Sequence, residues 1–209
     1  MNLRKLYPTM TPFVGSRVAA GAPPRLLLIG ESHYLPKDST VHLDDEAWYA
    51  GVKLGVEETR WISTANIVRG ACKAKFSKRA HRIWKNAFHA INEAGPGYAE
   101  TAEVAEDLVI YNFFQRPAKQ GKSLKPTALD ATVANDVFQA ILREHQPRAV
   151  AFVSRRGWWH LSSKETLGLP AAATAHPTSA HWNRVCKVYN NRTGRQVLVD
   201  FVRSLDWRS

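Results

Sequence analysis

The chain has 209 residues, of which 44% are hydrophobic and 10% aromatic, so it can bury one sizeable core and is not expected to be disordered. Its formal net charge of +11 predicts attraction to phosphate backbones and other anionic surfaces. The two cysteines, Cys72 and Cys186, exclude a disulfide framework, a four-cysteine zinc site and an iron–sulfur cluster, and the apolar runs are too short to cross a bilayer. We therefore expect a monomeric, cytoplasmic protein with one domain over residues 1–209, no membrane association and no cofactor.

The positive charge is concentrated in two segments. No acidic residue occurs between Thr59 and Asn92, and a second cluster lies in a loop-like stretch after residue 115. The basic residues of the two segments are Arg60, Arg69, Lys73, Lys75, Lys78, Arg79, Arg82 and Lys85, and then Arg116, Lys119, Lys122 and Lys125. Such clustering indicates a polyanion-binding surface more than simple solubility.

The first half of the chain predicts a lead-in, one strand and one helix. Residues 1–24 are rich in proline, which breaks helices, and are expected to be extended with at most a short helix. Residues 26–30 form a continuous apolar run that ends in glycine, typical of a strand buried on both faces of a parallel sheet. Between Ser77 and Glu93 apolar residues recur every three or four positions, which predicts an amphipathic helix.

The second half continues the alternation of strands and helices. Strands are predicted over residues 107–111, 148–153 and, more weakly, 171–175, and helices from Thr127 to just before Pro147 and over residues 198–205. This alternation predicts an α/β fold, a three-layer α/β/α sandwich around a short, mostly parallel four-stranded sheet. Ligands of such sheets bind at the carboxyl ends of the strands. The polar segments there are Gly30–Tyr34, Asn112 and His176–Ser179, which are therefore the site candidates.

These segments resemble the motifs of the uracil-DNA glycosylase superfamily, over roughly residues 25–184. The three segments are Leu28-Ile29-Gly30-Glu31-Ser32-His33-Tyr34, then Val109-Ile110-Tyr111-Asn112-Phe113-Phe114-Gln115-Arg116-Pro117, and finally Ala175-His176-Pro177-Thr178-Ser179-Ala180-His181. The resemblance implies a DNA glycosylase, which hydrolyses the N-glycosidic bond of a flipped-out base and leaves an abasic site. No lysine nucleophile occurs in these motifs, so a monofunctional enzyme without a lyase step is expected.

The resemblance also implies roles for individual residues. His176 would stabilise the anion of the departing base, and Asn112 would read the edge of that base together with the Gly30 turn. Tyr34 would crowd the C5 position of a pyrimidine. A base-stacking aromatic usually follows the first motif, and Trp48 or Tyr49 are the candidates. The plainer alternatives are a loop histidine, an asparagine that closes a strand, and ordinary packed aromatics.

The first motif departs from the family pattern. Ser32 occupies the position of the water-positioning Asp or Asn, and His33 replaces the proline. We expect Glu31 to position the water, with Ser32 and His33 as further candidates, because serine is a weak base. These departures suggest a divergent member whose base is a modified pyrimidine, which would suit a role in anti-phage defence. Uracil as the base and a role in DNA repair stay open.

DNA contacts are expected from the last motif and from the segment after the second. The candidates are Ser179, His181, Trp182 and Arg184, with Trp182 as a wedge between bases, and Arg116 and Lys119 on phosphate. The segment Arg155–His160 is another groove candidate, although its paired tryptophans are as readily explained by packing.

Other classes of function remain open from the sequence. A non-catalytic nucleic-acid-binding protein on the same scaffold would fit the missing Asp. Other nucleotide-binding or hydrolase folds lack support, because the chain contains no Gly-x-Gly-x-x-Gly, Walker or Gly-x-Ser-x-Gly motif. Metal binding by His33, His42, His176 and His181 lacks helical His spacing or a matching carboxylate, and no metal is expected.

Overall fold

The computed structural model describes residues 11–95, 97–205 and 207 of the chain. In chain order the strands and α-helices are β1 (Phe13–Val14), α2 (Ser16–Ala19), β2 (Leu26–Gly30), β3 (Tyr34–Leu35), α3 (Asp45–Tyr49), α4 (Val56–Ile62), α5 (Thr64–Lys73), α6 (Arg82–Glu93), β4 (Leu108–Asn112), β5 (Ala118–Lys119), α7 (Ala128–His145), β6 (Val150–Phe152), α8 (Arg155–His160), β7 (Ala171–Ala173) and α9 (Gly194–Ser204). Short 3-10 helices are η2 (Arg79–His81), η3 (Thr101–Asp107), η4 (Ala180–Trp182) and η5 (Lys187–Tyr189).

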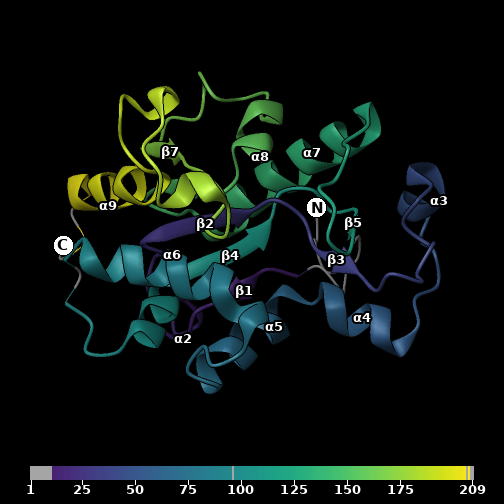
Figure 1. The fold of residues 1–209 in the computed structure, drawn as a ribbon, viewed down its shortest axis with the longest axis horizontal. Helices are drawn as coiled ribbons and strands as arrows, with labels where there is room; N and C mark the ends of the chain where they lie inside the picture. Colours follow the sequence, from purple (N-terminus) through teal and green to yellow (C-terminus); the bar gives the residue numbers. More distant parts are fainter. Residues whose placement is uncertain (1–10, 96, 206, 208–209) are drawn as a thin grey trace.

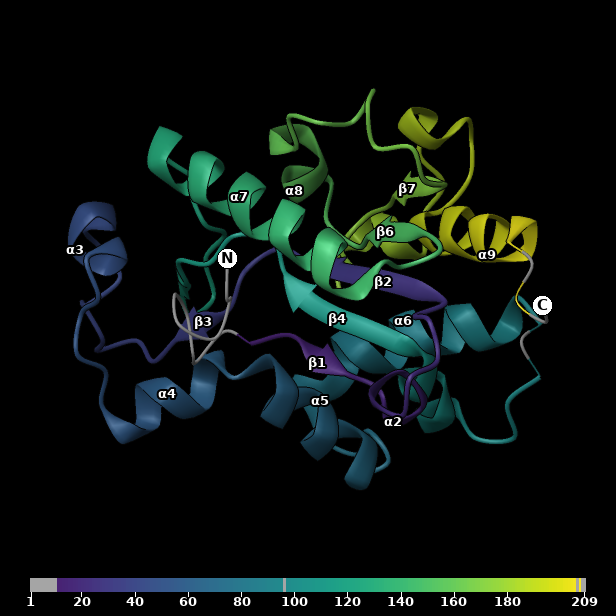
Figure 2. The same ribbon diagram turned by 180° about the vertical axis from the view of Figure 1, so that it is seen from behind.

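The main sheet has five strands in the order β1-β4-β2-β6-β7 (Figures 1 and 2). The pairs β4–β2, β2–β6 and β6–β7 are parallel, so the four predicted strands and their parallel arrangement are confirmed. The fifth strand, β1, pairs antiparallel with β4 at the edge. It lies within the segment expected as a lead-in, of which residues 1–10 are outside the described residues.

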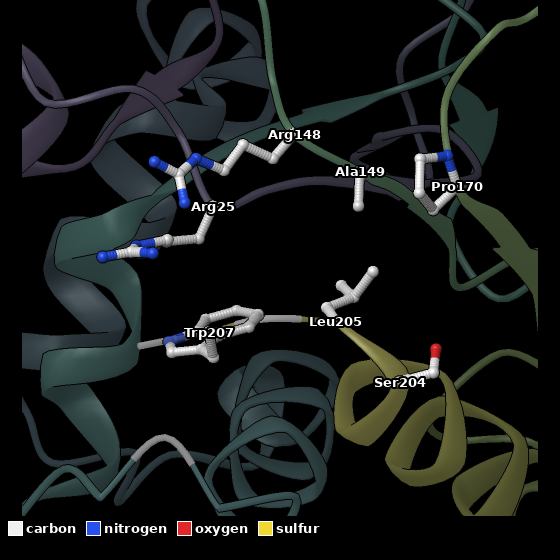
Figure 3. Close-up of a pocket in the computed structure, with 7 residues that line it drawn as sticks. All are labelled: Arg25, Arg148, Ala149, Pro170, Ser204, Leu205 and Trp207. Carbon is white, nitrogen blue, oxygen red and sulfur yellow. The ribbon is translucent and has the colours of Figure 1, made fainter. Parts of the chain in front are cut away.

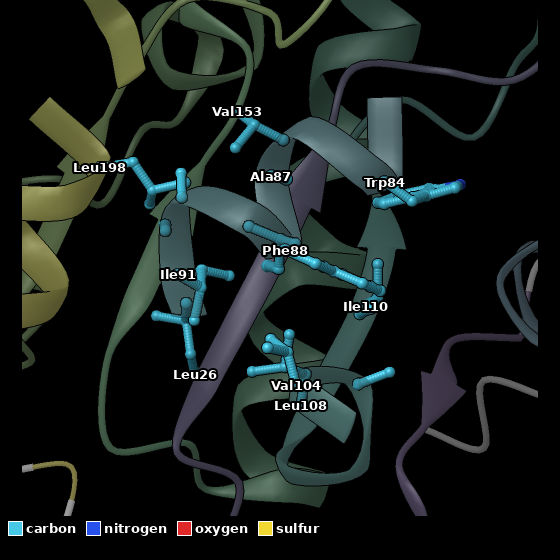
Figure 4. Packing of buried hydrophobic residues seen from close by; sticks show 14 of the residues in the cluster. Leu26, Trp84, Ala87, Phe88, Ile91, Val104, Leu108, Ile110, Val153 and Leu198 are labelled. Carbon is cyan, nitrogen blue, oxygen red and sulfur yellow. The ribbon is translucent and has the colours of Figure 1, made fainter. Parts of the chain in front are cut away.

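Alternate residues of the strands point to opposite helical layers. Leu26 and Leu28 of β2 pack in a cluster with α5, α6 and α9, where Phe88 and Leu198 lie (Figure 4). Leu27 and Ile29 pack on the other face in a cluster with α7 and α8. Because both faces are covered, strands of continuous apolar sequence are favourable here. The predicted α/β/α sandwich is therefore confirmed.

Helix boundaries differ from the predicted ones where the chain turns sharply. The helix expected from Ser77 begins as α6 only at Arg82, because Lys75 and Phe76 adopt positive φ angles of 44° and 56° and the single turn η2 follows. By contrast, α7 begins as predicted, since Thr127 and Asp130 form a reciprocal capping box. It ends at His145, just before Gln146 takes a left-handed conformation.

A second, smaller hydrophobic core lies outside the sandwich. β3 and β5 pair in parallel as a two-stranded sheet. Leu35, Trp48 and Ile62 form the buried centre of this region. We call residues 34–62, together with β5, the small lobe. The segment from Leu35 to Trp48 is thus a part of a packed unit. Within the described residues, no helix is both long enough and apolar enough to cross a bilayer.

Candidate functional site

Four polar residues lie at or just beyond the ends of the parallel strands. Asn112 is the last residue of β4, Glu31 follows β2, and Ser154 lies two residues after β6. His176 lies three residues beyond β7. Gly30 is in register with Asn112, and Phe152 is in register with Ile29 and Ala173, so all these strand ends share one edge of the sheet. We call this edge the carboxyl edge.

The Asn112 carboxamide lies directly over Gly30. A Cβ atom at position 30 would overlap Asn112 Oδ1, so glycine is what lets the carboxamide occupy this place. Asn112 is only 7% exposed, yet its side chain forms no hydrogen bond with any residue that the structure describes. Gln115 Nε2 instead donates to the Asn112 backbone carbonyl over 2.8 Å. The amide therefore has a donor and an acceptor that no described residue uses, with its Oδ1 packed against Gly30.

The Glu31 carboxylate is held by two residues from the neighbouring α8 region. Ser154 Oγ donates to Glu31 Oε2 over 2.9 Å, and Arg156 Nη1 lies 3.5 Å from Glu31 Oε1. The Glu31 side chain remains 20% exposed, which leaves lone pairs accessible from the carboxyl edge. Tyr34, 40% exposed, stands in the same electrostatic environment: burial raises its pKa first, and the Glu31 charge raises it further while Arg156 opposes.

The His176 ring is oriented by the residue two positions later. The Thr178 backbone amide donates to His176 Nδ1 over 3.3 Å, and Thr178 Oγ1 lies 2.9 Å from the same nitrogen. Because an amide can only donate, Nδ1 must be an acceptor, and the neutral ring carries its proton on Nε2. Burial lowers the His176 pKa, while the Glu31 charge raises it in part. A neutral imidazole with an Nε2–H donor is therefore favoured.

The loop that carries His176 is fixed by two helices of the sandwich. Asn86 Nδ2 of α6 donates to the Pro177 carbonyl over 2.8 Å. Gly194, the first residue of α9, packs so closely on Ala175 that a Cβ there would lie 2.8 Å from the Ala175 Cβ. These contacts make the loop a rigid extension of the helical layer.

Several residues expected at the site belong instead to the small lobe or to its boundary. His33 is buried, with Nε2 2.8 Å from Thr64 Oγ1, and burial lowers its pKa to about 4, so it is not a catalytic group of the carboxyl edge. Trp48 is buried in the core of the small lobe and cannot stack on a base. Tyr49 Oη donates to Asp130 Oδ1 over 2.8 Å. Helix α3, which carries both aromatic residues, lies at the far end of the molecule from β7 (Figures 1 and 2).

The predicted phosphate ligand Arg116 is also a structural residue. Its side chain is buried and forms a 2.5 Å ion pair with Asp130, and its Nη1 donates to the His42 carbonyl over 3.0 Å. Hydrogen bonding to Asp130 raises the Arg116 pKa despite burial. Since its donors are engaged within the protein, Arg116 is not available to DNA. Lys119 is exposed.

The predicted DNA-contacting loop is divided between core and surface. Trp182 is 2% exposed and packs in the same cluster as α6 and α9, so it is not a wedge. The Ser179 hydroxyl is buried without a hydrogen-bond partner among the described residues, and so is not presented to phosphate. His181 and Arg184 are exposed and remain available. Ser32 is half-buried next to Glu31.

Sequence reasoning missed Ser154, Asn86 and Thr178 as parts of the site. The position of Ser154 could have been predicted, because it directly follows the strand predicted over residues 148–153 and must therefore lie at the carboxyl edge. Thr178 was inside the third motif but was given no role. Asn86 had no signal, since its contact with Pro177 spans two distant parts of the chain.

A pocket of about 260 Å³ lies at the opposite, amino edge of the sheet (Figure 3). Arg25, Arg148 and Pro170 from the starts of strands line it together with Trp207. In Figure 3 the two arginine side chains lie close together beside the indole. Ligands of parallel sheets bind at the other edge, so we do not assign the site here. Among the described residues, no three His, Cys, Asp or Glu side chains gather as metal ligands.

Comparison of the chain with protein-family models and with curated proteins finds no match.

Proposed function

We propose that this protein is a monofunctional DNA glycosylase that removes an extruded, pyrimidine-derived base and leaves an abasic site, in DNA repair or anti-phage defence. The observation that carries the proposal is that the Glu31 carboxylate, the Asn112 amide and the Nε2–H of His176 all lie at the same edge of a parallel sheet. The likeness of these three segments to uracil-DNA glycosylase motifs supports the same activity.

Each group has a part in hydrolysis of an N-glycosidic bond. As the bond breaks, the base gains negative charge and the sugar gains positive charge. His176 Nε2–H would donate to the base oxygen that becomes anionic, and a preorganised donor of this kind contributes about 3–4 kcal/mol. Asn112 would pair with the base edge through its free amide. Glu31 would stabilise the cationic sugar and orient the attacking water, with Ser154 and Arg156 fixing the carboxylate.

The exposed basic surface supports DNA as the partner. All eight basic residues between Arg60 and Lys85 are exposed, and those of α6 adjoin Asn86, which contacts the His176 loop. A duplex bound with one base at the carboxyl edge would therefore meet positive charge beside it. In the proposed setting the protein acts as a monomer in the cytoplasm, where Cys72 and Cys186, both unpaired, would stay reduced.

The proposal is tested by base excision from duplex and single-stranded DNA that contains either uracil or modified cytosines. Alkali cleavage of the product reveals the abasic site. We expect His176→Ala to lower the single-turnover rate about 10²- to 10³-fold. His89→Ala is the matched control, because His89 is an exposed histidine of α6 away from the strand ends. Asn112→Ala should lower the rate and reduce discrimination between bases.

The same assay includes the result that would reject the enzyme. Tight, sequence-tolerant DNA binding with no abasic product from any of these substrates would favour a non-catalytic nucleic-acid-binding protein. Equal excision rates for wild type and His176→Ala would remove the assigned chemistry even if a base were released.

A further inference from the structure

An aromatic and cationic stack lies on the outer side of α8. The Arg155 guanidinium lies 5.1 Å from the centre of the Trp159 ring and 5.2 Å from that of Tyr189. Tyr189 is buried, whereas Trp159 is 59% exposed. The arginine therefore fixes the tryptophan against the body of the protein while most of the indole surface stays open to solvent.

Two exposed apolar side chains lie close to Tyr189 in the sequence. Val185 is 64% exposed and Val188, next to Tyr189 in η5, is 60% exposed. Large apolar groups so exposed in one area indicate an interaction surface. We call Arg155, Trp159, Val185, Val188 and Tyr189 the platform.

The charge around the platform selects the class of partner. Between positions 155 and 192 the chain has one acidic residue, Glu165, and six basic residues, namely Arg155, Arg156, Lys164, Arg184, Lys187 and Arg192. Arg156 and Arg192 are paired with Glu31 and Asp200, so the positive excess comes from the other four. An apolar protein partner would gain nothing from this excess of positive charge. A nucleic acid strand supplies both aromatic bases for the indole and phosphates for the cations.

The platform is directly connected to the carboxyl edge. Arg155 and Arg156 are consecutive residues of α8, and they point to different partners: Arg156 to Glu31, and Arg155 to Trp159 and Tyr189. Consecutive Cα atoms are about 3.8 Å apart. A strand whose extruded base faces Glu31 would therefore bring a flanking nucleotide to the platform.

We infer that the platform binds an unpaired base of the DNA strand next to the extruded one, by stacking on Trp159. This inference rests on the proposed function for the identity of the ligand. It predicts that the protein prefers substrates whose flanking bases are unpaired, such as single strands, bulges and duplex ends, over continuous duplex.

The test is binding of a short fluorescein-labelled single strand, followed by fluorescence anisotropy. We expect Trp159→Ala to raise Kd about 10- to 100-fold, as loss of base–aromatic stacking does, and Trp159→Phe to restore most of the affinity. The salt dependence of binding should be unchanged by Trp159→Ala, because no phosphate contact is removed. Leu43→Ala is the matched control, since Leu43 is also 59% exposed but lies in the small lobe.

Unchanged Kd for Trp159→Ala, or an equal loss for a blunt duplex without unpaired bases, would overturn the platform. A parallel excision assay separates this result from failure of the proposed function. If the wild-type protein excises a base but Trp159→Ala binds the single strand with unchanged Kd, the platform is rejected and the glycosylase proposal stands. Strong dependence of strand binding on Trp159 with no base excision rejects the glycosylase and retains the platform as a strand-binding surface.

Discussion

The carboxyl edge and the small lobe both contain the polar residues that the sequence motifs single out, but they use them differently. In the small lobe and at its boundary, His33 bonds to Thr64, and Arg116 and Tyr49 both bond to Asp130. At the carboxyl edge, the Asn112 amide and His176 Nε2 make no hydrogen bond to any described residue.

This difference separates polar groups that are engaged within the protein from polar groups that have no internal partner. A buried polar group without a partner costs free energy, so proteins normally satisfy it internally. His33, Arg116 and Tyr49 follow this rule and are part of the folded scaffold. His42 of the small lobe is the exception among the described residues there, because both of its ring nitrogens are buried without a hydrogen-bond partner. At the carboxyl edge, the Asn112 amide and His176 Nε2 have no partner among the described residues, and a bound base would supply one. The comparison predicts large effects on stability in the first region and on ligand chemistry in the second.

The largest expected effect on stability is that of Asp130→Ala. The substitution leaves Arg116 as a buried cation without its partner, since the Arg116 side chain is 8% exposed and the Asp130 side chain is 0% exposed. We expect a loss of about 3–5 kcal/mol in the free energy of unfolding, measured by urea denaturation. Glu57→Ala, which removes an exposed pair with Arg60, should cost no more than about 1 kcal/mol. Similar small losses for both variants would contradict the structural role of Arg116.

Acid should weaken the boundary of the small lobe through His33. Its pKa is lowered to about 4 in the folded protein, while an unfolded histidine titrates near 6.5. Between these pH values the His33 side chain is protonated in the unfolded state but neutral in the folded state. Its contribution to the free energy of unfolding is therefore fully present above about pH 6.5 and falls by about 1.4 kcal/mol for each pH unit below it. Urea denaturation at several pH values measures this slope. His33→Gln should flatten it, and an unchanged slope would show that other groups are responsible.

The smallest of these effects, and the one that connects stability to the site, is that of Gly30→Ala. The added Cβ overlaps Asn112 Oδ1, so the carboxamide must move. We expect a destabilisation of about 1–3 kcal/mol, together with a lower excision rate comparable to that of Asn112→Ala. Gly70→Ala is the control: this exposed helical glycine of α5 has no atom within 4 Å of a new Cβ and should gain about 0.5–1 kcal/mol. An excision rate for Gly30→Ala equal to that of the wild type would contradict the idea that Gly30 sets the position of the Asn112 amide.

The predictable part of the fold followed from local patterns. Residues 26–30 are apolar throughout and end in glycine, so they had to form a strand buried on both faces. The capping box of Thr127 and Asp130 indicated the start of α7, and Pro147 indicated its end, which the structure places at His145. Helices α3, α4 and α5 were not predicted, although the sequence of α5 is clearly amphipathic. The two-residue strand β1 had too few residues to show any periodicity.

The sequence by itself placed Glu31, Asn112 and His176 at or just beyond strand ends, and therefore at one edge of the sheet. Only the tertiary structure decided which polar residues are occupied within the protein, because that depends on partners far away in the chain. Arg116 is engaged by Asp130 at the start of α7, and Trp182 is covered by helices from both halves of the chain. A motif specifies the type of a side chain and its place along a strand, whereas availability to a ligand depends on the packing of all the surrounding elements.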